Sequence, residues 1–139
     1  MDVQGVLKRG LCNGLDVVKV LGKVLVPVIF LVTFLEHSGW LPRIAELTAP
    51  LMDLFGLPGE AALVLVVGNL TNVFGALGAM MTMELTAREV TILGVMVTIS
   101  HSLPSETVVI SKAGAHGKWA LLYRLLASIF FGILLNVLI

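Results

Sequence analysis

The sequence is short of charge and of cysteine. Charged residues make up 13% of its 139 residues, against roughly 25% in soluble domains. Nine basic and nine acidic residues cancel, so the chain lacks the net positive charge expected of a nucleic-acid-binding protein. The single Cys12 cannot form an intramolecular disulfide, and no Cys/His cluster has zinc-site spacing. There is no Walker loop, dinucleotide fingerprint, nucleophile elbow or HExxH, so we expect neither an enzyme nor a bound cofactor.

What the sequence does contain is hydrophobic. Apolar residues make up 58% of the chain, against roughly 45–50% in ordinary globular proteins. A soluble domain of this size needs more polar residues to cover its surface. Because residues 1–4 include an acid and no basic residue, a cleaved signal peptide is not expected. The composition therefore predicts an all-α integral membrane protein.

The apolar segments predict about four transmembrane helices. A helix needs about 20 mostly apolar residues to cross the hydrocarbon core. The segment 60–83 meets this requirement best, because no charge lies between Glu60 and Glu84. The other predicted membrane segments are 17–37, 88–103 and 118–139, with an N-terminal surface helix over 1–16 and an amphipathic interfacial helix over 41–55. With four crossings, five basic residues fall on the N-terminal side and three on the other, which favours a cytoplasmic N-terminus.

A proline predicts that one helix is discontinuous. Pro104 has no backbone N–H and disfavours helical geometry at the preceding residue, so the helix that starts near Glu89 ends there. A half-helix over 104–115 follows. The two opposed helix ends bring a negative and a positive partial charge together, and Ser102 or Ser105 is available as a cap.

His101 and Glu106 lie beside this break. An ionisable side chain at membrane depth costs at least about 2.5–3.5 kcal/mol, so a functional role is its default interpretation. The alternative is that Glu106 only pairs with Lys112 or Arg124. If a metal ion binds, Glu106 and His101 are its candidate ligands.

A second polar stretch lies inside the segment 60–83. The carboxamides of Asn69 and Asn72 need hydrogen-bond partners, because hydrocarbon offers none. One interpretation is close helix packing, with Gly68, Asn72, Gly75 and Ala79 on one helix face and Gly68, Gly75 and Gly78 as the packing glycines. The other is a local unwinding of the helix that exposes backbone groups to a ligand.

These motifs resemble the nucleoside-recognition (Gate) family of membrane proteins. The resemblance covers roughly 20–139, and its most specific part is the His-Ser-x-x-x-Glu stretch at 101–106. It is carried by the following stretches: 56–60, 68–78, 100–106, 112–114 and Arg124. Related domains occur in concentrative nucleoside transporters, in ferrous-iron permeases and in small stand-alone proteins. The resemblance implies one Gate-like domain over 1–139 in a multi-pass protein of the bacterial inner membrane.

The resemblance and the polar motifs predict a half-transporter. Transporters commonly build a midplane site from two repeats, each with a broken helix, and this chain holds one such unit. We therefore expect an antiparallel homodimer or a heterodimer with a related half-size protein in the lipid bilayer. The solute is a small polar molecule or cation, with nucleosides among the candidates. The predicted binding residues are Asn69, Asn72, Ser100, His101, Ser105 and Glu106. The alternative function is a non-transporting scaffold that docks a partner membrane protein.

Overall fold

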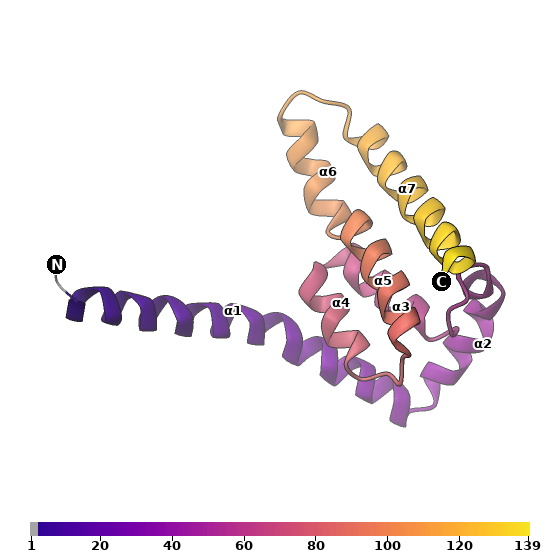
Figure 1. Cartoon of the computed structure of the whole chain (residues 1–139), viewed down its shortest axis with the longest axis horizontal. Helices are drawn as coiled ribbons and strands as arrows, with labels where there is room; N and C mark the ends of the chain where they lie inside the picture. Colours follow the sequence, from indigo (N-terminus) through magenta and orange to yellow (C-terminus); the bar gives the residue numbers. More distant parts are fainter. Residues whose placement is uncertain (1–2) are drawn as a thin grey trace.

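The chain is helical throughout the part that its structure describes. This structure is a computed structural model that describes residues 3–139, and within that range it contains helices and no strand. Three stretches are long and apolar enough to cross a membrane: Gly5–His37, Ala87–Lys112 and Gly117–Leu138. The predicted all-α membrane class is therefore confirmed. Figure 1 shows short helices packed beside the long ones.

α1 (Val3–His37) is a single helix of 35 residues, about 52 Å long at 1.5 Å per residue. No boundary separates the predicted surface helix from the predicted span, because isolated glycines weaken a helix without ending it. The first two residues of that surface helix lie outside the described residues. Val28 and Val32 are 8% and 0% exposed, whereas residues 6–20 are exposed throughout. That N-terminal half projects from the rest of the molecule (Figure 1).

α2 (Trp40–Met52) and the short 3-10 helix η1 (Asp53–Phe55) cover the predicted amphipathic segment 41–55. They end at Gly56, whose backbone is left-handed (φ 62°). The Arg88 guanidinium donates to the carbonyls of Gly56 and Asn136, each at 3.1 Å. These bonds hold the end of η1, the start of α5 (Ala87–Ser100) and the end of α7 (Gly117–Leu138) together.

The predicted membrane segment 60–83 is not one continuous helix, and the local unwinding that its sequence allowed is present. This segment forms two short helices, α3 (Ala61–Leu70) and α4 (Val73–Met80). Asn72 between them is extended (φ −167°, ψ 179°), and its side-chain oxygen accepts from the N–H of Gly75 at 3.0 Å. The Thr71 hydroxyl donates to the carbonyl of Val67 at 2.7 Å. The extended backbone of Asn72 and its cap on α4 interrupt this apolar run. The bond of Thr71 is of a kind that Thr91 and Thr98 also make inside the unbroken α5.

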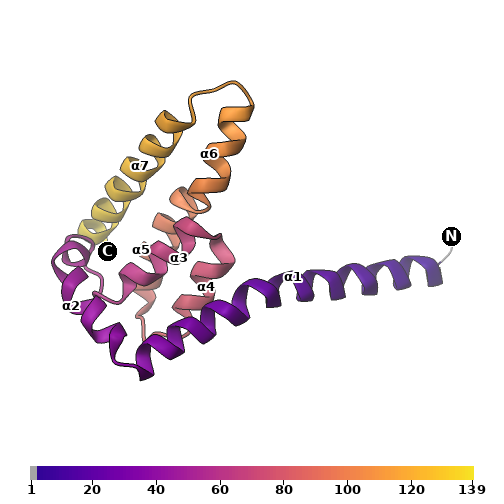
Figure 2. The ribbon, with the colours of Figure 1, turned by 180° about the vertical axis from the view of Figure 1, so that it is seen from behind.

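α3 and α4 fold back on each other as a hairpin. In a continuous helix Gly68 and Ala76 would lie about 12 Å apart along the axis. Here a Cβ added at Gly68 would lie 2.9 Å from the Cβ of Ala76, and Figures 1 and 2 show the two helices side by side. The ten residues of α3 extend about 15 Å, half the thickness of a hydrocarbon core. The hairpin is thus too short for either of its helices to cross.

The predicted break before Pro104 is present. α5 ends at Ser100, His101 is extended (ψ 159°), and α6 (Leu103–Lys112) starts two residues later with Pro104 in its first turn. Ser102 between the helices has φ 54°, and it is the one non-glycine residue with a positive φ in residues 3–139. α6 continues in nearly the direction of α5 (Figure 1). The break therefore interrupts a span and does not reverse the chain.

The hydrophobic core lies around α3 and α5, with buried side chains from α1, α4 and the α2–η1 segment packed against them. α7 approaches α5 closely at Gly132, where an added Cβ would lie 2.7 Å from the sulfur of Met96 and 2.9 Å from Phe55. The largest fully buried side chains are Val32, Val64, Ile92, Leu93, Val97 and Ser100. Ser100 is the one polar side chain among these six, and Ser128 of α7 is buried as well.

Candidate substrate site at two helix breaks

The two helix breaks meet. The N–H of Ser102 donates to the carbonyl of Gly68 at 3.1 Å, and its hydroxyl donates to the carbonyl of Thr71 at 2.8 Å. The tip of the α3–α4 hairpin therefore lies against the middle of the α5–α6 span. Both breaks leave helix-end backbone groups without helical partners, so this junction is a polar place within the membrane-spanning region.

Glu106 is held on two sides. Its Oε2 accepts from Nη1 of Arg124, and its Oε1 lies 3.4 Å from Nε2 of His101. Arg124 also donates from Nε to the carbonyl of Ile99 at 2.8 Å. The side chains of Glu106, His101 and Arg124 are 39%, 29% and 22% exposed. The pairing with Arg124, one of the two alternatives from the sequence, is thus present, and the carboxylate still has an open side.

The hydrogen bonds of His101 define where its proton lies. Nδ1 is 3.0 Å from the carbonyl of Thr98, and a carbonyl only accepts, so Nδ1 carries the hydrogen. In the neutral ring Nε2 would then present a lone pair to the Glu106 carboxylate, which is repulsive. A proton on either Nε2 or Oε1 turns this contact into a hydrogen bond. The geometry therefore makes His101 and Glu106 a pair that can share one proton or hold a cation.

Asn69 and Ser100 belong to a separate, interior group. The Ser100 hydroxyl lies 2.8 Å from Oδ1 of Asn69 and 3.4 Å from the hydroxyl of Ser128. The Ser128 hydroxyl also donates to the carbonyl of Met96 at 3.1 Å. Ser100 and Ser128 are 1% and 4% exposed. These side chains line a mostly apolar cavity of about 190 Å³ between α2, α3, α5 and α7.

The remaining predicted site residues make local bonds. Asn72 caps α4, and the Ser105 hydroxyl donates to the carbonyl of Ser102 at 3.0 Å. The six predicted residues therefore divide into a group around Glu106, the interior pair Asn69 and Ser100, and the cap Asn72. Their role in binding stays a prediction.

The three predicted packing glycines lie at close helix contacts. An added Cβ at Gly68 would meet Val97 of α5 at 3.1 Å as well as Ala76. At Gly78 it would meet Leu25 of α1 at 3.1 Å, and at Gly75 it would meet Thr71. Close packing and local unwinding, the two interpretations of this stretch, therefore occur together.

Few side chains of the described residues are placed to bind a metal ion. Among residues 3–139 no group of three or more His, Cys, Asp or Glu side chains is placed to hold a metal ion. Glu106 and His101 supply two donors, and Arg124 already occupies one carboxylate oxygen. Met80 and Met83 pack against the hydrophobic core, as expected for apolar side chains.

Sequence reasoning missed Ser128, and it identified Ser102 only as a candidate helix cap and not as the residue that joins the two breaks. A signal for Ser128 exists on α7, where Arg124, Ser128 and Gly132 recur every four residues and so share one face. This face meets α5, as the bonds of Arg124 to Ile99 and of Ser128 to Met96 show. No comparable periodicity marks Ser102, because its role depends on a backbone conformation.

The fold and the site define a class: a helical membrane protein with polar side chains gathered at discontinuous helices. The chain belongs to the nucleoside-recognition (Gate) family, whose model matches residues 18–119. It is 42% identical over 105 residues to the uncharacterised membrane protein YvoD of Bacillus subtilis, covering 76% of this chain and 34% of that protein.

A second relative is the Fe(2+) transporter FeoB of Methanocaldococcus jannaschii. The chain is 37% identical to it over 71 residues, covering 51% of this chain and 11% of FeoB. The matched part of the chain thus spans about a third of YvoD and a smaller share of FeoB. No solved structure matches the chain.

Proposed function

We propose that the chain is one half of a membrane transport unit. Membership in the Gate family and the likeness to an Fe(2+) transporter indicate a transport-related role rather than catalysis. The observation that carries the finer proposal is the group formed by Glu106, His101 and Arg124 beside the meeting point of two helix breaks. Discontinuous helices are a common way to build a substrate site at membrane depth.

The open side of Glu106 is the reason to expect a second unit. Its side chain is 39% exposed although it lies in the membrane-spanning pair α5–α6. Hydrocarbon does not solvate a carboxylate, so water or another polypeptide has to cover this side. A second unit with its own helix breaks encloses a polar compartment between the two copies of the site. The second unit is either another copy of this chain or a related half-size protein.

Each residue of the Glu106 group has a role in this proposal. Glu106 accepts a proton or ligates a cation, and His101 is its hydrogen-bond partner or second ligand. Arg124 holds the carboxylate in place through its bonds to Glu106 and to the carbonyl of Ile99. Ser105 and Asn72 bond polar groups of the solute, with the interior pair Asn69 and Ser100 behind them. The solute is a small polar molecule or cation, nucleosides and Fe(2+) being the first to test, and the membrane is the bacterial inner membrane.

One observation favours a different function. Arg124 already satisfies one oxygen of Glu106 within the chain, as in a pair that only stabilises the fold. In that case the protein is a non-transporting scaffold that docks a partner membrane protein. The Glu106 group then has no part in its activity.

Flux measurements separate the two functions. Purified protein in liposomes is assayed for uptake of labelled uridine, of Fe(2+) and of protons, with Glu106→Gln as the test variant and the loop variant Glu84→Gln as its matched control. Transport predicts flux of at least one probe above that of empty liposomes, lost in Glu106→Gln and kept in Glu84→Gln. A scaffold predicts that neither substitution changes capture of its partner and that all probes stay at the empty-liposome level.

A further inference from the structure

The ends of the helices gather at two opposite ends of the molecule. The end of η1, the start of α5 and the end of α7 are joined by the bonds of Arg88 to Gly56 and Asn136. α2 joins the same group, because the Thr48 hydroxyl donates to the carbonyl of Gly59 at 2.7 Å, just before α3. The α6–α7 turn lies at the opposite end (Figure 1). The N-terminal end of α1 points away from α2 and toward the side of that turn in both views (Figures 1 and 2).

The hairpin determines which loops share a side of the membrane. Its tip bonds to Ser102, near the middle of the 26-residue stretch Ala87–Lys112, so α3 enters to half depth and α4 returns. The α1–α2 turn and the α4–α5 loop therefore lie on the same side. Three crossings remain, by α1, by α5–α6 and by α7. The expectation of four crossings places the α4–α5 loop on the opposite side.

With three crossings the charges separate. The side with the N-terminal half of α1 and the α6–α7 turn holds six of the nine basic residues: Lys8, Arg9, Lys19, Lys23, Lys112 and Lys118. The other side holds two, Arg43 and Arg88. That other side also carries six of the nine acidic residues: Glu36, Glu46, Asp53, Glu60, Glu84 and Glu89. The net charge of zero is thus the sum of a basic surface and an acidic surface on opposite sides.

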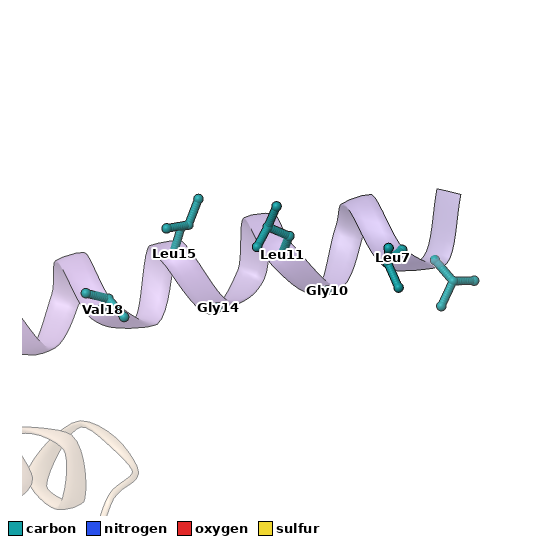
Figure 3. A pocket seen from close by; sticks show the side chains of 7 residues that line it. Leu7, Gly10, Leu11, Gly14, Leu15 and Val18 are labelled. Atoms are coloured by element: carbon teal, nitrogen blue, oxygen red, sulfur yellow. The ribbon is translucent and has the colours of Figure 1, made fainter. Parts of the chain in front are cut away.

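α1 shows how the basic surface meets lipid. The helix is about 52 Å long and the hydrocarbon core about 30 Å thick, so about 15 residues extend beyond the core. Its exposed half has an apolar face, shown in Figure 3, and its basic residues Lys8, Arg9 and Lys19 lie outside that face. The apolar face consists of Val6, Leu7, Gly10, Leu11, Gly14, Leu15 and Val18. Such a two-faced segment suits the boundary between acyl chains and anionic headgroups.

We infer that the protein has one orientation in the membrane, with its basic surface against the anionic headgroups of the cytoplasmic leaflet. An excess of Lys and Arg marks the cytoplasmic side of membrane proteins, and six against two is a far stronger bias than the five against three of a four-crossing arrangement. This orientation also limits what the second unit can be, a point that rests on the proposed function. An inverted copy of this chain would place its basic surface on the wrong side. The second unit is therefore not an antiparallel copy.

Cysteine labelling tests the orientation without reference to transport. A membrane-impermeant maleimide is applied to spheroplasts and to inside-out vesicles, with labelling in detergent as the reference for reactivity. The reporters are the exposed native Cys12 and, in a Cys12→Ser background, Ser38→Cys, Glu84→Cys and Ala115→Cys, which replace exposed residues. Cys12 and Ala115→Cys should react only in inside-out vesicles. Ser38→Cys and Glu84→Cys should react only in spheroplasts.

Other patterns overturn the inference. Glu84→Cys on the side opposite Ser38→Cys would mean that the hairpin crosses. Equal labelling from both sides would mean two orientations, and the mirror pattern would mean the reverse orientation. Because labelling needs no flux, failed transport leaves this result intact, and a failed topology leaves the site to be judged by its own assay.

Neutralising part of the basic surface tests whether that surface sets the orientation. With Lys8, Arg9, Lys112 and Lys118 all replaced by Gln, we expect the reporters to become labelled from both sides. The control replaces Glu36 and Glu46 on the acidic surface with Gln and should keep one orientation, since acidic residues contribute little to orientation. An unchanged pattern in the four-residue variant would show that the basic surface does not set the orientation.

Discussion

The N–H of Ser102 donates to the carbonyl of Gly68 at 3.1 Å, so the break in the α5–α6 span is bonded directly to the end of α3. The hydroxyl of Ser102 adds a second bond, to Thr71 at 2.8 Å. A non-glycine residue in the left-handed region costs about 1–2 kcal/mol, and two hydrogen bonds of about 1 kcal/mol each offset that cost. The contact between the two breaks therefore depends on one serine in an unusual conformation.

Substitutions at Ser102 should separate strain from hydrogen bonding. Ser102→Gly loses the hydroxyl bond and relieves the strain, so we expect a stability within about 1 kcal/mol of the parent. Ser102→Val loses the same bond and adds a β-branched side chain at φ 54°, so we expect a loss of about 2–3 kcal/mol. Denaturant titration of the detergent-solubilised protein measures both variants. Equal stability of Gly and Val would show that the left-handed conformation is not maintained.

Alanine substitutions at Gly68 and at Gly94 should change stability in opposite directions. Gly68→Ala places a methyl group 2.9 Å from the Cβ of Ala76, and overpacking of this kind costs typically about 1–3 kcal/mol. Gly94→Ala is the matched control, since nothing lies within 4 Å of an added Cβ there. Alanine in that helix interior should raise stability by about 0.5–1 kcal/mol. A neutral Gly68→Ala would contradict the close approach of α3 and α4.

The pair formed by Glu106 and Arg124 should show coupling. Arg124→Ala removes the partner of a partly exposed carboxylate and the donor to Ile99, and we expect a loss of about 1–3 kcal/mol. Glu106→Gln combined with Arg124→Ala should cost less than the sum of the two single changes, because no unpaired carboxylate remains. Stability measurements on the four proteins of this cycle give the coupling. Lys112→Ala serves as the control, and strict additivity would show that the two side chains do not interact.

The break before Pro104 could be predicted from the sequence, because proline acts on its own backbone and on the residue before it. The break at Asn72 was harder to predict, since the same residues also suit an uninterrupted span of sufficient length. Two features decide it: the cap in which the Gly75 N–H donates to the Asn72 side chain, and the close packing of α4 on α3 at Gly68. The composition shows that the apolar segment is long enough to cross, but it does not show whether this bond and packing interrupt the helix.

The candidate site was predicted in part for a similar reason. His101, Ser105 and Glu106 are close in sequence to the break, so local reasoning finds them. The separation of Ser100 from His101 depends on the rotation of α5 at its last turn, which buries Ser100 among α3 and α7. Neighbouring residues in sequence therefore belong to different groups, and only the packing of the helices shows it.

Two substitutions of His101 should separate the roles of its two ring nitrogens. Asparagine places an N–H near the position of Nδ1 and can keep the bond to the carbonyl of Thr98, but nothing then faces Glu106. Glutamine reaches toward Glu106 as Nε2 does and loses the bond to Thr98. We expect His101→Asn to fold with parental stability and to lose the flux tested above. His101→Gln should lose about 0.5–1.5 kcal/mol of stability, the net value of one hydrogen bond.

Flux in liposomes and denaturant midpoints, measured on the same preparations, check this split. His116→Asn is the control, because His116 lies in the exposed α6–α7 turn, away from Glu106, and should change neither quantity. If His101→Asn transports as well as the parent, the proton between Nε2 and Glu106 has no part in transport. The role of Glu106 would then be structural, because its ion pair with Arg124 holds α6 to α7.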